Sequence, residues 1–153
     1  MSLSFNESTE NQAWGSSVMS AKKVLIIEDD HDVRLGYHVL LKANHYDTFL
    51  AADGVSAISE ALKHRPDLTI LDLGLPGGDG FTVLDTFRTS TFLSALPVIV
   101  VSGRELHGTR ERALKAGAKA YLQKPWNDYE LLATIRKLLG QSDVSATRPK
   151  WDH

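Results

Sequence analysis

Two apolar runs of this sequence end directly in acidic residues. Val24–Ile27 is followed by Glu28 and Asp29, and Leu68–Leu71 is followed by Asp72. Carboxylates brought close together repel one another at neutral pH unless a cation neutralises them. Magnesium prefers such oxygen ligands and often binds phosphate oxygens beside them. Because Asp72 ends a run that should be buried on both faces, it is the first candidate for chemistry.

Two further polar residues follow later apolar runs. Ser102 comes after Pro97–Val101, and Lys124 comes after the run that ends at Gln123. A carboxylate nucleophile, Mg²⁺, an ammonium and a hydroxyl together suit phosphoryl transfer, whose transition state mainly needs charge stabilisation and alignment. The product would be an aspartyl phosphate on Asp72.

The elements that carry these residues are predicted to alternate between strands and helices. Apolar runs indicate strands at about 24–27, 46–51, 68–72, 97–101 and 118–123, with helical patterns between them. Such alternation is typical of right-handed βαβ units and a parallel sheet. We therefore expect an α/β fold, a doubly wound five-stranded parallel sheet with helices on both faces. Ligands of such sheets bind outside the carboxyl ends of the strands, where all the candidate residues would meet.

Some helix ends and faces can also be predicted. Asp53, Asp79 and Asn127 are natural N-caps, and Glu130 follows Asn127 at the spacing of a capping box. Asp30 is interpreted as a helix-start acid outside the metal ligands. The helix after Asp53 is expected to turn four residues inward: Val55, Ile58, Ala61 and Leu62.

The length of 153 residues suits one domain with tails. Residues 1–20 are polar and without periodicity, which predicts a disordered N-terminal extension or tag. The folded domain is predicted over 22–140, and 141–153 would form a C-terminal tail or the start of a linker.

Composition narrows the classes of function. A net charge of -2 gives no electrostatic footprint for nucleic acid, so direct nucleic-acid binding is not expected. The absence of cysteine excludes disulfides, thiolate catalysis and thiolate zinc sites. No apolar run approaches the length of a membrane span, and the N-terminus does not resemble a signal peptide, so no membrane association and a cytoplasmic location are expected.

Taken together, the motifs resemble the receiver domain of two-component response regulators over about 22–140. Four segments carry the resemblance, in the family's order and spacing: Ile26–Asp30, Leu71–Gly80, Val100–Gly103 and Tyr121–Pro125. The resemblance implies a flavodoxin-like (βα)5 fold with strand order 2-1-3-4-5. It also implies a signalling switch whose only catalysis is its own phosphoryl transfer and autodephosphorylation.

The resemblance further implies roles for the candidate residues. Asp72 would accept a phosphoryl group from a histidine kinase or histidine phosphotransfer protein. Glu28, Asp29, Asp72 and the carbonyl of Gly74 would hold Mg²⁺. The output would pass to a downstream effector protein or to an output domain missing from this chain, and a homodimer is compatible with the family.

The remaining roles concern the phosphate and the switch. Ser102 and Lys124 would grip the phosphate, Tyr121 would be the switch aromatic that follows Ser102, and the Lys124–Pro125 bond would be cis. Gly74 departs from the family by lacking a side chain where relatives often have one, and Arg104 is large and cationic. Both positions flank the route of water to the phosphoryl group, so the sequence leaves its lifetime open.

Two alternative functions of different class fit parts of the sequence. A receiver-like module that acts without phosphorylation remains open, although intact Asp72, Asp29 and Lys124 argue against it. A phosphatase or mutase with an aspartyl nucleophile would need a second acid two residues after Asp72, and Gly74 stands there.

Overall fold

The computed structural model describes residues 20–75, 80–103 and 108–141. Five parallel strands form one sheet in the order β2-β1-β3-β4-β5, which confirms the predicted fold class and strand order. The elements in chain order are β1 (Lys23–Ile27), α2 (His31–Ala43), β2 (Asp47–Ala51), α3 (Gly54–His64), β3 (Leu68–Asp72), α4 (Gly80–Thr89), β4 (Val98–Ser102), α5 (Thr109–Lys115), β5 (Ala120–Gln123) and α6 (Asp128–Leu138).

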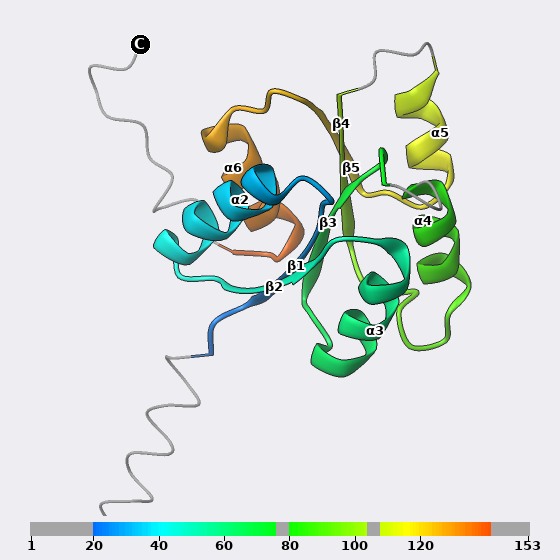
Figure 1. Ribbon diagram of the computed structural model, residues 1–153, viewed down its shortest axis with the longest axis horizontal. Coiled ribbons are helices and arrows are strands. Elements are labelled where there is room, and N and C mark those ends of the chain that lie inside the picture. The colour runs from blue at the N-terminus through cyan, green and yellow to red at the C-terminus, as the bar shows by residue number, and fades with distance from the viewer. Residues whose placement is uncertain (1–19, 76–79, 104–107, 142–153) are drawn as a thin grey trace, which may run out of the picture.

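The helices lie in two layers, one on each face of the sheet. Helices α2 and α6 cover one face, and α3, α4 and α5 cover the other (Figure 1). Each layer encloses its own apolar core, so β3 and β4 are buried at every position. Burial on both faces explains why these strands read as continuous apolar runs in the sequence. No helix among the described residues is long and apolar enough to cross a membrane.

The strand register brings the carboxyl ends of the inner strands level with one another. Ile27 of β1 pairs with Leu71 of β3, so Glu28 follows at the same height as Asp72. Asp72 in turn pairs with Val101, the residue before Ser102. The candidate residues therefore meet at one edge of the sheet, as the topology predicted.

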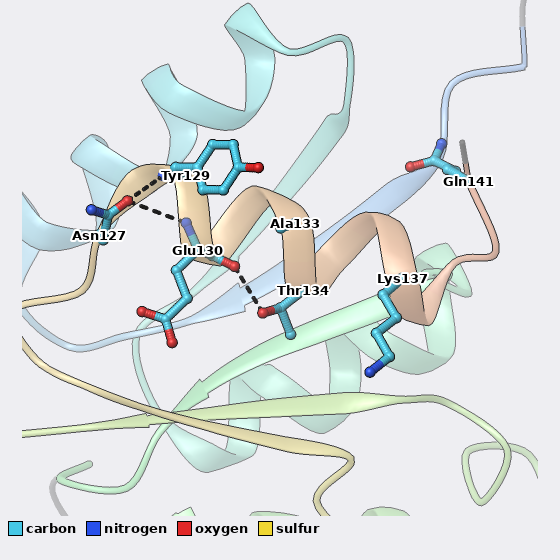
Figure 2. A pocket seen from close by; sticks show the side chains of 7 residues that line it. All are labelled: Asn127, Tyr129, Glu130, Ala133, Thr134, Lys137 and Gln141. Atoms are coloured by element: carbon cyan, nitrogen blue, oxygen red, sulfur yellow. Dashed lines mark hydrogen bonds between the residues drawn. The ribbon is translucent and has the colours of Figure 1, made fainter. Parts of the chain in front are cut away.

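Side-chain caps fix the starts of three helices. Asp30 caps α2, Asp53 caps α3 through the amide of Ser56, and Asn127 caps α6. Figure 2 shows the Asn127 side chain accepting from the amides of Tyr129 at 2.8 Å and Glu130 at 3.2 Å. The predicted caps at Asp53 and Asn127 are confirmed, whereas Asp79 lies outside the described residues.

The predicted inward face of α3 is wrong in two positions. Val55 is 85% exposed and Leu62 is 41% exposed, while Ala57 and Ala61 are fully buried and Ile58 is partly buried. The small side chains at 57 and 61 let the helix backbone approach the core closely. Val55 and Leu62, seven positions apart, consequently fall on the flank of the helix.

Candidate functional site

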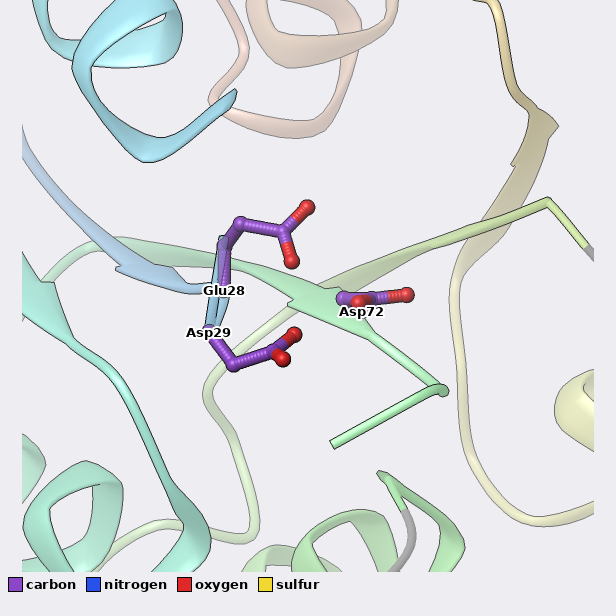
Figure 3. A group of neighbouring side chains, drawn as sticks. All are labelled: Glu28, Asp29 and Asp72. Carbon is purple, nitrogen blue, oxygen red and sulfur yellow. The ribbon is translucent and has the colours of Figure 1, made fainter. Parts of the chain in front are cut away.

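Three carboxylates converge at the carboxyl edge of the sheet. Glu28 and Asp29 follow β1, Asp72 ends β3, and their nearest carboxylate oxygens all lie within 4.8 Å of one another. Figure 3 shows the side chains of Glu28 and Asp29 extending to the same side as that of Asp72. Glu28 is 1% exposed and Asp72 9%, whereas Asp29 is exposed, so the cluster opens to solvent beside Asp29.

Backbone contacts hold the loop that carries these acids. The amide of Glu28 donates to the carbonyl of Ala51 at 3.0 Å. Arg34, which no sequence pattern singled out, donates from Nη1 to the carbonyls of Glu28 at 2.8 Å and Asp29 at 3.2 Å. Asp30 is occupied as the cap of α2, which agrees with its interpretation as a helix-start acid.

Lys124 brings a positive charge from the end of β5. Its Nζ lies 2.6 Å from Oε1 of Glu28 and 3.7 Å from Oδ2 of Asp72. Its amide donates to the carbonyl of Ser102 at 2.9 Å, which joins the ends of β4 and β5. The Lys124–Pro125 bond is cis, as the resemblance implied. Glu28, rather than Asp72, is therefore the closer partner of the ammonium.

Negative charge is in excess at this edge. Burial raises the pKa of Glu28 to about 7, and the neighbouring Asp72 contributes to the rise, while Lys124 acts to lower it. One ammonium thus does not fully compensate the carboxylates. A proton or a further cation is needed to neutralise them, and their hard oxygen ligands fit a divalent ion such as Mg²⁺.

The chain after β3 contacts the Asp72 carboxylate through Gly74. The amide of Gly74 donates to Asp72 Oδ1 at 3.1 Å. Gly74 is exposed, and a Cβ there would lie 3.6 Å from Asp72 Oδ2. Arg104, the other residue expected beside the phosphoryl route, lies outside the described residues.

Three aromatic residues complete the surroundings of the acidic cluster and Lys124. Tyr37 of α2 stacks flat on Trp126, with ring centroids 4.3 Å apart, a contact that no sequence pattern indicated. Tyr121 of β5 is half-buried and packs against the core beneath α3, α4 and α5. Its expected role as a switch stays a prediction.

Comparison with known proteins identifies the family. A family model described as the response regulator receiver domain matches residues 24–136, so the chain belongs to this family of two-component signalling domains. The chain is 34% identical to the transcriptional regulatory protein PrrA of Mycobacterium leprae over 129 residues, 84% of this chain and 54% of that protein. It thus spans about half the length of that relative.

Two more similarities concern single receiver domains. The chain is 32% identical over 121 residues to the polar-differentiation response regulator DivK of Brucella anthropi, covering 79% of this chain and 98% of DivK. A crystal structure of the receiver domain of the sensor histidine kinase PA1611 from Pseudomonas aeruginosa matches with a TM-score of 0.73 and 29% identity, covering 80% of this chain and 100% of that one. That structure holds a magnesium ion coordinated in its active site cleft.

Proposed function

We propose that this receiver domain accepts a phosphoryl group on Asp72 in a Mg²⁺-dependent reaction and thereby changes its partner-binding surface. The donor would be the phosphohistidine of a histidine kinase or histidine phosphotransfer protein. The observation that carries the proposal is the convergence of Glu28, Asp29 and Asp72 within 4.8 Å, with the Lys124 ammonium beside them.

The transfer step is a displacement at phosphorus. A carboxylate oxygen of Asp72 forms the new O–P bond while the N–P bond of the phosphohistidine breaks, and the imidazole nitrogen keeps the electron pair. Glu28, Asp29, Asp72 and the carbonyl of Gly74 would hold the cation. Bound Mg²⁺ would neutralise charge between the transferred oxygens and these ligands.

Lys124 and Ser102 would donate hydrogen bonds to the oxygens of the phosphoryl group on Asp72. The ammonium already lies 3.7 Å from Asp72 Oδ2, so a small side-chain movement would let it donate to the added oxygens. Ser102 is 1% exposed at the end of β4, and its hydroxyl would donate to another oxygen. Attack of water on phosphorus would later release inorganic phosphate and restore the Asp72 carboxylate, so the chain acts only on itself.

Phosphorylation would shift the population of conformations. The phosphoryl group adds close to two negative charges beside Ser102 and Lys124. Movement of Ser102 toward the phosphoryl group would shift Tyr121 and α5. Helix α5 is short, and its buried residues are Thr109 and Ala113 alone. An effector protein or output domain that prefers this arrangement would read the signal.

The test is the intact mass after incubation with acetyl phosphate, with and without Mg²⁺. Wild type should gain about 80 Da, the mass of one phosphoryl group, only when Mg²⁺ is present. Asp72→Asn should gain nothing, while Asp85→Asn, a change at an exposed acid on α4, should behave as wild type. No adduct on wild type would favour the module that acts without phosphorylation.

A further inference from the structure

The Tyr37–Trp126 stack joins α2 to the segment that carries Lys124. The two rings are nearly parallel, at 8° between their planes and 4.3 Å between centroids. Tyr37 is 2% exposed and belongs to the core beneath α2 and α6, and Trp126 packs against that core. The indole Nε1 also donates to Asp128 Oδ1 at 3.2 Å in the first turn of α6. Trp126 is therefore held from two directions.

The segment around Lys124 is held at two points. Its own amide is bonded to the carbonyl of Ser102, and Trp126 stands two residues further along the chain. The backbone that carries the ammonium is thus fixed both at the lysine and after it. From there Nζ reaches Glu28 at 2.6 Å and Asp72 at 3.7 Å, a placement that a shift of the backbone would change.

The charges of the carboxylates also act on Tyr37. Burial raises the pKa of its hydroxyl, and the negative charges of Glu28 and Asp72 raise it further. Tyr37 therefore interacts electrostatically with the acidic cluster as well as stacking on Trp126. Among the described residues, this is the stacked ring pair that joins α2 to the segment after Lys124.

We propose that Tyr37 and Trp126 are positioning residues, whose stacked rings hold the Lys124 segment so that the ammonium reaches both Glu28 and Asp72. The role rests on the proposed function, since its consequence for rate is expressed in phosphorylation of Asp72. Loss of either ring would let the Lys124 ammonium move away from Glu28 and Asp72. The rate of phosphoryl transfer would fall, because misplacement of a catalytic group by about 1 Å has large effects on rate.

The experiment compares ring-removing with ring-preserving substitutions. Tyr37→Leu and Trp126→Leu should lower the phosphorylation rate at saturating acetyl phosphate and Mg²⁺ by at least about fivefold. Tyr37→Phe and Trp126→Phe, which keep a stack, should retain most of the rate. Phe49→Leu is the matched control, because it removes a ring stacked on His64 at 4.0 Å in the opposite layer. Thermal unfolding of each variant checks that it is folded.

A second measurement tests positioning without phosphorylation. In a nitrogen-15 spectrum, the side-chain ammonium signal of Lys124, assigned by its loss in Lys124→Arg, should move toward that of a free lysine in Tyr37→Leu. It should stay in place in Tyr37→Phe and Phe49→Leu. An unchanged signal in Tyr37→Leu, or a rate equal to that of Phe49→Leu, overturns the proposal. A moved signal in a chain that takes up no phosphate supports positioning and overturns the proposed function instead.

Discussion

The ammonium of Lys124 lies 2.6 Å from Oε1 of Glu28, a carboxylate with 1% exposure. Asp72 is the more distant partner, at 3.7 Å. Lys124 thus neutralises part of the negative charge that a metal ion would otherwise neutralise. The lysine and the cation are expected to compete electrostatically at this edge of the sheet, although the proposed phosphoryl transfer would use both.

Removing the lysine should therefore separate metal binding from phosphorylation. Lys124→Met is expected to tighten Mg²⁺ binding by about tenfold, because a positive charge close to the metal ligands is lost. The same variant should be phosphorylated much more slowly. Titration calorimetry measures the first effect and intact mass the second. Lys119→Met, at an exposed position before β5, is the control. Weaker Mg²⁺ binding in Lys124→Met would show that the lysine orients Glu28 for the metal.

Stability should depend on pH through Glu28. The folded pKa of about 7 exceeds the ordinary value of 4.5, so the folded state binds the proton more tightly. Without metal, this residue's contribution to the free energy of unfolding is greatest below pH 4.5 and is lost as pH rises to about 7. Mg²⁺, which binds the ionised carboxylates, should restore stability above that pH.

Urea unfolding at pH 5 and pH 8, with EDTA or Mg²⁺, checks this dependence. The increase in the free energy of unfolding on adding Mg²⁺ should be larger at pH 8 than at pH 5. Glu28→Gln should reduce this difference in the Mg²⁺ effect between the two pH values. An equal gain at both pH values would mean that protonation of Glu28 does not compete with Mg²⁺ binding.

The absence of a side chain at position 74, beside Asp72, should govern how long the phosphoryl group lasts. A Cβ at position 74 would make ordinary contacts with the Asp72 carboxylate, at 3.6 and 3.7 Å, so a side chain there fits the fold. Gly74→Met is expected to slow dephosphorylation severalfold by covering the approach of water. The decay of the mass adduct after removal of the donor measures this lifetime. An unchanged lifetime would place the path of water elsewhere.

Two glycine-to-alanine changes should have opposite effects on stability. A Cβ on Gly80 would lie 2.6 Å from the Cα of Leu73 and 2.8 Å from the carbonyl oxygen of Asp72. Gly80→Ala should therefore lower the free energy of unfolding by about 2 kcal/mol, because the start of α4 must move off the end of β3. A Cβ on Gly36, within α2, would meet nothing within 4 Å, so Gly36→Ala should raise it by roughly 0.5–1 kcal/mol. Urea unfolding measures both, and a stable Gly80→Ala would contradict the close packing.

The sheet and the meeting of Glu28, Asp72 and Lys124 followed from the sequence because each of their strands ends in a polar residue. Buried parallel strands leave clear apolar runs, and the topology then aligns their ends. The face of α3 was harder to predict, because Ala57 and Ala61 give a weaker apolar signal than Val55 and Leu62 but allow closer packing.

Details that depend on distances of an ångström could not be predicted. Whether Lys124 lies nearer Glu28 or Asp72 depends on side-chain geometry that residue types do not specify. The Tyr37–Trp126 stack requires the crossing of α2 with the segment before α6. Arg136, a charged residue buried to 8% exposure, donates to Asn44 at 3.4 Å, and no periodicity marked it as interior.

The bond between Lys124 and Glu28 spans 96 positions of the chain. It joins the residues that follow the carboxyl ends of β1 and β5, so it cannot form before both strands are in the sheet. Contacts of such long range come late in folding, since the closure entropy of the chain must be overcome first. The bond should consequently contribute little to the folding rate and act mainly by slowing unfolding.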